Sequence, residues 1–453
     1  MEIFKVGLII AVGIGFLFAF LRFPRQLFLY YILVKPVIDR FAEMGASVGG
    51  VSLGYHYIAA LVIPAVSLIY VIINRCNIFL LPHKTLLIGY MGLNLFSFII
   101  EGDHSLTVAG FFIRVIFPLF LFFSIPFILS QREHVLKFIR YSAISGIFPC
   151  AMIVLQRVGF IAHNREAEGI GDTIYARATG GYADAFSVAL PIVISIFCLY
   201  FLIQNSREKG ESSKFFWLLL VVYLVCLVFT FHRMTFIVIM LITALWSIIN
   251  RKMGVILLVS GLVIVSLPVI ANFVPNFFSD LLVTEWVGGS SADPKIAVSD
   301  QTFHGRFGLW RRYLEIFEQS SQFEKIFGIM MAGRAPHNDF LRILITNGLM
   351  GLSVYLALLF ASGLRLMHAF YFFRRNGEQF MTQCVLTALF FFLFYVLGSF
   401  TLAISLLSSM SWYLWIFAGI AYFQLSKYRS EASRLSKGPL HSLFPSQRFV
   451  SKT

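Results

Sequence analysis

Long apolar runs recur along the whole sequence and constrain its fold more than any other feature. Most of these runs hold about 17 to 25 residues, enough for a helix to cross a bilayer. Hydrophobic residues make up 58% of the 453-residue chain and charged residues only 13%, which excludes an ordinary soluble enzyme. The sequence therefore predicts an all-α polytopic membrane protein with about 12–13 transmembrane helices. The candidate spans are roughly 5–22, 26–40, 51–73, 85–100, 106–129, 135–160, 183–204, 215–231, 234–250, 254–272, 340–372, 380–398 and 402–425.

The sequence carries no signature of metal or cofactor chemistry. Its five cysteines are scattered, without the paired spacing of a zinc site or a disulfide framework. It contains no HExxH, P-loop or GxSxG motif and no carboxylate pair with metal-ligand spacing. We therefore expect neither a metal nor a cofactor. The first apolar run has no small-residue cleavage site and is followed by further spans, so we expect an anchor.

Basic residues between the spans predict how the chain is oriented. If the basic tail 426–453 is cytoplasmic, five basic loops fall on its side of the membrane, as the positive-inside rule requires. These are the loops with Arg75/Lys84, Arg132/Lys137, Arg207/Lys209/Lys214, Arg251-Lys252 and Arg374-Arg375. The net charge of +14 thus indicates sidedness and not a nucleic-acid partner.

The remaining loops face the other compartment, and two of them are long. The predicted organisation is an N-terminal bundle of about ten spans (1–272, with an arginine loop near 161–182), a large outer loop (273–338), C-terminal transmembrane helices (339–425) and the basic tail (426–453). Within the large loop, residues 306–319 show helical periodicity, with Phe307, Trp310, Leu314 and Phe317 on one face. We expect this amphipathic helix to lie on the membrane surface or to cap the bundle.

Several arginines fall at the outer mouths of the spans. Arg177, Arg233, Arg306 and Arg334 belong to outer loops, and Arg114 lies about two turns inside the span 106–129. A guanidinium group binds phosphate oxygens with a fork of donors, and an arginine inside a membrane usually lines a polar site. These arginines are candidate ligands for an amphiphile with a phosphate head. The alternative for Arg114 is snorkelling, or an internal ion pair with Glu101 or Asp103.

His337 begins a transmembrane segment within this basic group. Its ordinary pKa near neutrality makes it a candidate proton acceptor, and a helix N-terminus favours the neutral base. The alternative is an interfacial or capping histidine. Asn338 and Asp339 are expected to cap the helix, and Gly348 and Gly351 to permit close packing.

The stretch GRAPHNDFLRILITNGLMGL (333–352) resembles the histidine-asparagine, leucine-rich signature of the O-antigen ligase and Wzy-type O-antigen polymerase superfamily. Other features follow in the order typical of that superfamily: Arg177 with Gly180, Arg233, and Arg306 with Trp310. Two positions depart from it, since His232 stands where many relatives have serine, and ADAF (183–186) replaces an aspartate-proline-asparagine.

The resemblance implies a bacterial inner-membrane enzyme with its active site facing the periplasm. Members move a glycan from undecaprenyl diphosphate to an acceptor hydroxyl without a metal, in the biosynthesis of O-antigen, lipopolysaccharide or exopolysaccharide. By the resemblance, Arg177, Arg233 and Arg306 bind the diphosphate and His337 activates or orients the acceptor. The partners it implies are the lipid-linked donor, a glycan or lipid A-core acceptor, the bilayer and other polysaccharide-assembly proteins.

Polymerase, ligase and protein oligosaccharyltransferase remain open, with polymerase preferred because no acceptor domain follows the spans. The alternative from another class is a transporter or flippase of an anionic lipid-linked substrate. A transporter predicts charged or broken helices near the bilayer midplane and internal repeats. The sequence instead crowds its charges at one face.

Overall fold

The computed structural model describes the helical body of the chain and parts of its connections. The described residues are 17–18, 20–41, 45–48, 51–78, 81–100, 106–161, 178–182, 184–230, 232–252, 254, 261, 306–328, 337–402, 405 and 407–437. The predicted spans near 5–22 and 254–272, and most of the two long outer loops, lie outside them.

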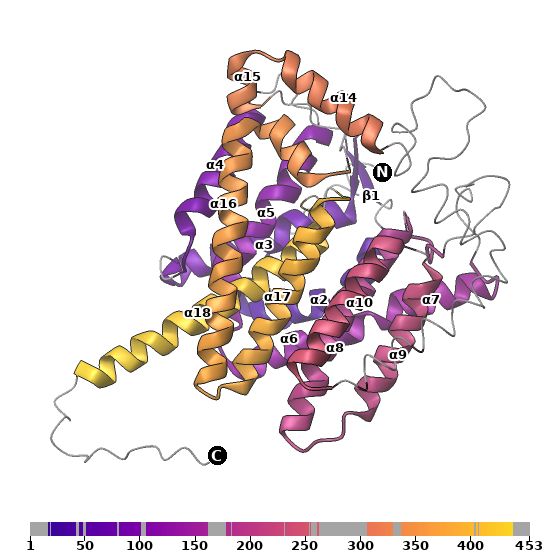
Figure 1. Ribbon diagram of the computed structural model, residues 1–453, viewed down its shortest axis with the longest axis vertical. Coiled ribbons are helices and arrows are strands. Elements are labelled where there is room, and N and C mark those ends of the chain that lie inside the picture. Colours follow the sequence, from indigo (N-terminus) through magenta and orange to yellow (C-terminus); the bar gives the residue numbers. More distant parts are fainter. Residues whose placement is uncertain are drawn as a thin grey trace.

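Helices make up nearly all of this described part, so the helical fold class is confirmed (Figure 1). The described part also contains a short antiparallel hairpin of two four-residue strands, β1 and β2. The elements in chain order are α2 (Pro24–Arg40), β1 (Gly45–Val48), β2 (Val51–Gly54), α3 (Tyr55–Ile73), α4 (Lys84–Ile100), α5 (Leu106–Ile128), α6 (Arg132–Ser145), α7 (Ile147–Arg157), α8 (Ala185–Glu208), α9 (Lys214–Phe229), α10 (Arg233–Ile249), α14 (Arg306–Gln319), α15 (Gln322–Phe327), α16 (Asp339–Arg375), α17 (Gln379–Ser399) and α18 (Ser408–Lys437).

Four helical stretches in the described part are long and apolar enough to cross a membrane: Arg132–Arg157, Ala185–Glu208, Asp339–Arg375 and Gln379–Ser399. Each coincides with a predicted span. Five shorter apolar helices lie at other predicted spans, namely Leu61–Ile73, Lys84–Ile100, Phe112–Ile128, Lys214–Phe229 and Met234–Ile249. The last predicted span, 402–425, corresponds to α18, which begins later, at Ser408, and continues past residue 425 into the basic tail.

Helix α8 lies at the centre of the bundle. Asp184 caps its first turn by accepting a hydrogen bond from the Ser187 backbone N–H at 2.6 Å. Its side chains are buried almost from end to end, packed against α6, α9 and α17. The Phe197 ring lies 5.0 Å from Phe391 of α17, with an edge-to-face geometry that aromatic pairs favour. Aromatic packing between helices therefore contributes much of the core.

Helix α16 is broken near its start. Gly348 has φ 67° and ψ −169°, which separates a short first segment, 339–347, from the long remainder. The end of α15 crosses at this break. A Cβ on Gly348 would lie less than 3.0 Å from the carbonyl oxygen of Ile326, and one on Gly328 equally close to that of Thr346. The two backbones thus touch directly, which only glycine permits. The predicted role of Gly348 in close packing is confirmed, together with a break that the sequence did not predict.

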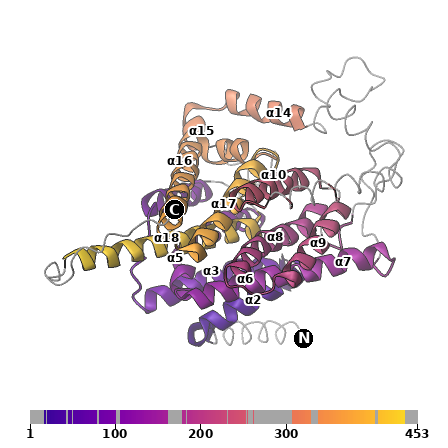
Figure 2. The same cartoon turned by 60° about the horizontal axis from the view of Figure 1, so that its bottom comes forward.

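The amphipathic helix α14 begins and ends where the periodicity predicts. It caps the short first segment of α16, and Figures 1 and 2 both show α14 and α15 at the edge of the bundle beside it. Two residues of the predicted face, Trp310 and Phe317, pack against this segment, but the rest of the buried face differs from the prediction. Tyr313 packs with Leu341 and Ile345, whereas Leu314 is exposed, so the contact face is rotated towards Leu309, Trp310 and Tyr313.

Candidate functional site

The basic loops gather at one end of the molecule, which we call the basic end. The Arg132 guanidinium lies 4.3 Å from the Phe380 ring at the start of α17, and Lys252 lies 5.0 Å from the Trp246 ring. Gln383 donates a hydrogen bond to Asn250 at 3.2 Å. The α8–α9 and α16–α17 connections both lie at the lower end in Figure 1. The structure thus brings together loops that the sequence places on one side of the membrane.

The opposite end, called here the far end, carries the polar residues at the start of α16. Asn338 caps this helix by accepting a hydrogen bond from the Leu341 backbone N–H at 3.0 Å, and its amide donates to the Phe400 carbonyl at 3.2 Å. His337, immediately before the cap, is exposed and has φ 50°. A side chain in this left-handed backbone region costs about 1 kcal/mol or more. His337 is thus held towards solvent in a strained conformation.

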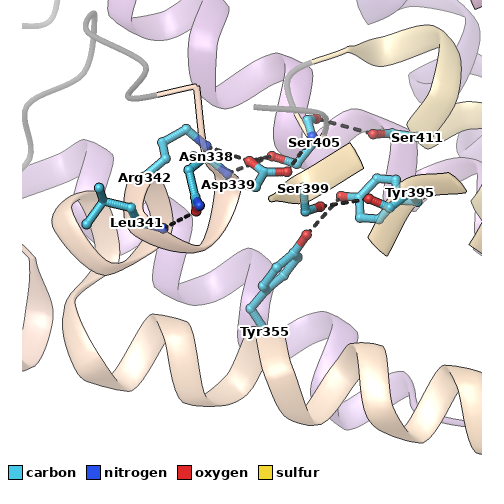
Figure 3. A network of polar contacts seen from close by, with 9 residues as sticks. All are labelled: Asn338, Asp339, Leu341, Arg342, Tyr355, Tyr395, Ser399, Ser405 and Ser411. Atoms are coloured by element: carbon cyan, nitrogen blue, oxygen red, sulfur yellow. Dashed lines mark hydrogen bonds and ion pairs between the residues drawn. The ribbon is translucent and has the colours of Figure 1, made fainter. Parts of the chain in front are cut away.

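Asp339 forms a buried ion pair instead of the predicted cap. Its carboxylate is 0% exposed and accepts a hydrogen bond from Arg342 Nε at 2.9 Å. Ser405, in the connection between α17 and α18, donates to the same carboxylate from its backbone N–H at 2.7 Å and its hydroxyl at 2.6 Å. Arg342 in turn donates to the Ser405 hydroxyl at 2.6 Å. Figure 3 shows the three side chains pointing toward one another. This network ties the start of α16 to the α17–α18 connection.

Three buried tyrosines lie close to the ion pair. Tyr355 donates a hydrogen bond from its hydroxyl to that of Tyr395 at 3.3 Å (Figure 3), and its ring centroid lies 5.4 Å from that of Tyr90. All three are almost fully buried. Tyrosine combines an apolar ring with a polar tip, so this layer joins the charged network to the apolar core.

A second ion pair, in which the lysine is buried and the aspartate partly buried, is linked to the first through one segment of the chain. Lys35 of α2 donates to Asp39 at 2.8 Å, and its ammonium lies 5.5 Å from the Trp412 ring. Ser409 donates to Asp39 at 3.1 Å, and Ser411 donates to the Ser405 carbonyl at 3.2 Å. The connection and first residues of α18, from Ser405 to Ser411, therefore contact both ion pairs at the far end.

The segment 178–182 is fixed against α2. Arg40 Nε donates to the Gly180 carbonyl at 3.0 Å, and the Tyr182 hydroxyl donates to the Pro36 carbonyl at 2.7 Å. Burial raises the pKa of Tyr182, and Asp39 raises it further, so this hydroxyl stays protonated and keeps donating. The backbone N–H of Ala178 donates to the Phe229 carbonyl at 3.1 Å. The segment following Arg177 is thus anchored at the far end.

The predicted site residues are described to different degrees. His337 lies at the far end. Arg233 and Arg306 are the first residues of α10 and α14, but their side chains lie outside the described residues, as do Arg177 and Arg334 entirely. Arg114 is half-buried in α5.

Helix directions place two of these arginines at the far end. Helix α10 begins there, since its last residues meet the start of α17 at the basic end. His232 caps α10 by accepting from the Thr235 backbone N–H at 3.3 Å. Helix α14, which begins at Arg306, packs on the first two turns of α16 that follow His337.

Sequence reasoning missed two ion pairs at the far end. Lys35 and Asp39 stand four residues apart in an apolar run, and Asp339 and Arg342 three apart, the spacings at which charges pair on a helix. That spacing inside a span was an available signal for a buried pair. Within the described ranges, no group of three histidine, cysteine or acidic residues is arranged to hold a metal ion.

The fold and these two chemically different ends define the class of the protein. It is a helical protein, and four apolar helices of its described part have the length of membrane spans, as in α-helical membrane proteins. The sequence matches no protein-family model, and no curated protein matches it. Assignment beyond this class rests on the site itself.

Proposed function

We propose that the protein is a metal-independent inverting glycosyltransferase of the O-antigen ligase and polymerase type. It moves a glycan from undecaprenyl diphosphate to an acceptor hydroxyl at the periplasmic face of the bacterial inner membrane. The observation that carries the proposal is the position of His337. It is exposed, strained and fixed beside a buried charged network, at the end opposite the basic loops.

The chemistry needs a proton acceptor and stabilisation of a leaving group. His337 takes the proton of the acceptor hydroxyl while that oxygen attacks the anomeric carbon of the donor sugar. The bond from this carbon to the diphosphate oxygen breaks, and undecaprenyl diphosphate leaves with the electron pair. The candidates to bind its negative charge are Arg177, Arg233, Arg306, Arg334 and Arg114. Attack from the opposite face inverts the anomeric carbon.

The acceptor distinguishes polymerase from ligase. If the acceptor is a second lipid-linked glycan, the protein is a polymerase, which is the alternative we prefer. If the acceptor is lipid A-core, the protein is a ligase. Both reactions use the same donor and the same proton transfer. Acceptor recognition depends on loop surfaces, which a shared fold does not determine.

A transporter or flippase of an anionic lipid-linked substrate is the second candidate, favoured by the break in α16 at Gly348. Roughly 27 residues follow the break, and at 1.5 Å each they span about 40 Å, more than the bilayer core. The break therefore lies near one surface and not at the midplane, which supports surface chemistry over transport.

The test is glycan transfer by purified protein in detergent with EDTA present. The donor is undecaprenyl-diphosphate oligosaccharide of the native glycan, supplied alone or with lipid A-core. We expect chain growth on donor alone, lost in His337→Ala and Arg306→Ala. Arg311→Ala is the matched control, because Arg311 is exposed on the same helix and pairs with exposed Glu315 at 3.2 Å.

The outcomes separate the candidates. Product only with lipid A-core identifies a ligase. Loss of transfer in the Arg311 control as well would show that the effect is not specific to the site. The enzyme proposal fails if neither product forms while reconstituted vesicles move the donor across the bilayer.

A further inference from the structure

Four positively chargeable side chains meet at the basic end, far from His337. We call them the phosphate cluster: His83 before α4, Arg365 and His368 of α16, and Arg429 of α18. An Arg429 nitrogen contacts His368 Nε2, and the His83 ring lies 5.8 Å from that of Tyr422 on α18. Arg365 interacts electrostatically with His83, His368 and Arg429. Three segments distant in sequence therefore direct like charges at one place.

The phosphate cluster has no acidic counterpart in the described part of the chain. The ion pairs found there join other residues, and none involves these four side chains. His83 Nε2 and Arg365 Nε are buried and have no hydrogen-bond partner among the described residues. Buried polar atoms in proteins are normally hydrogen-bonded, so these two atoms are open to a ligand, and the positive charge around them favours an anion. Burial and the neighbouring Arg365 guanidinium lower the pKa of His83, which reflects the positive charge beside this ring.

An apolar face on α16 accompanies these charges. Phe360, Leu364, Met367 and Tyr371 are exposed there, at the three- and four-residue spacing of one helix face. Arg365 and His368 lie between these residues in sequence. Acyl chains can cover such a face while a headgroup binds the adjacent cations.

We propose that the phosphate cluster binds the phosphate of an anionic phospholipid in the leaflet at the basic end. Two guanidinium groups can hold its oxygens with paired hydrogen bonds, and the histidines supply further donors. This inference is independent of the proposed glycan transfer, since it concerns the opposite end of the molecule.

The test measures binding and stability of the full-length protein in neutral detergent. Wild type is titrated with phosphatidylglycerol, with phosphatidylcholine and with inorganic phosphate. Arg365→Gln/Arg429→Gln is compared with Arg374→Gln/Arg375→Gln, a control that removes the same charge from exposed positions at the same end. We expect saturable binding of phosphatidylglycerol, at least tenfold weaker in the cluster variant only, and at least tenfold weaker binding of phosphatidylcholine and inorganic phosphate to wild type.

The stability readout separates binding from a structural role. Without lipid, Arg365→Gln removes a repelling charge, so the thermal midpoint of the variant should equal or exceed that of wild type. With phosphatidylglycerol present, wild type should have the higher thermal midpoint. A midpoint lowered equally with and without lipid would show a structural role and overturn the proposal. Lipid binding weakened equally in the Arg374→Gln/Arg375→Gln control would indicate an effect of diffuse surface charge. Inorganic phosphate bound as tightly as phosphatidylglycerol would indicate a site for the free ion. Either result would also overturn the proposal.

Discussion

The ion pair between Asp339 and Arg342 gives a quantitative prediction about stability. Its members are 0% and 2% exposed, so solvent cannot compensate either charge when the other is removed. Arg342→Met leaves a buried carboxylate, and Asp339→Asn leaves a buried guanidinium. Each single change should lower the free energy of unfolding by about 3–5 kcal/mol.

The double variant Asp339→Asn/Arg342→Met removes both charges and keeps similar shapes. Its loss should fall well short of the sum of the single losses, with a coupling energy of about 2 kcal/mol or more. The amide that replaces the Asp339 carboxylate keeps one side-chain oxygen, to which Ser405 can still donate, so part of the network remains. The residual loss in the double variant should therefore be small but measurable.

The assay is unfolding in mixed micelles with increasing sodium dodecyl sulfate, followed by tryptophan fluorescence. The four proteins of the cycle are measured under one condition. Single losses that add within about 0.5 kcal/mol would refute the reasoning, because they would show that the two charges act independently.

Three further outcomes follow from the backbone and the caps. Gly348→Ala should lower the thermal midpoint more than Gly377→Ala, because both glycines have positive φ but only the first meets another backbone; the φ strain alone costs about 1 kcal/mol, and equal losses would contradict the contact. Hydrogen bonds from Ser321 lower the pKa of Glu324 in the folded protein. The ionised carboxylate therefore stabilises the fold fully at pH values above the pKa that Glu324 has in the unfolded chain, and this stabilisation is lost as the pH falls through the pKa of the folded state. Circular dichroism against pH should show a smaller acid loss in Ser321→Ala than in wild type. His337→Gly should be more stable than His337→Ala by about 1 kcal/mol, since glycine relieves the left-handed backbone, while both variants lose glycan transfer.

Local patterns predicted the helices well. The amphipathic helix 306–319 has the predicted bounds because its periodicity is a property of consecutive residues. Its buried face was harder to predict, since Tyr313 and Leu314 are both able to pack and only α16 selects between them. The long apolar runs predicted about 12–13 spans, and four helices of spanning length in the described part lie at predicted spans.

The far-end network could not be predicted in the same way. Asp339 and Ser405 are 66 positions apart, and no local pattern indicates that the connection after α17 returns to the start of α16. The break at Gly348 depends on the backbone of α15, which lies outside the apolar run in which the glycine stands. Lys35 lies within the predicted span 26–40, and its neighbour Trp412 comes to it only through the fold.

The crossing of α15 over α16 has a consequence for how the sequence can vary. At Gly328 and Gly348 the neighbouring atoms belong to the main chain, so no change of side-chain volume elsewhere can make room for a larger residue. Ordinary core positions tolerate substitution when a neighbour shrinks, but these two positions have no neighbour able to do so. Libraries that diversify the surrounding helices should therefore recover glycine at both positions, while the apolar residues around them exchange freely.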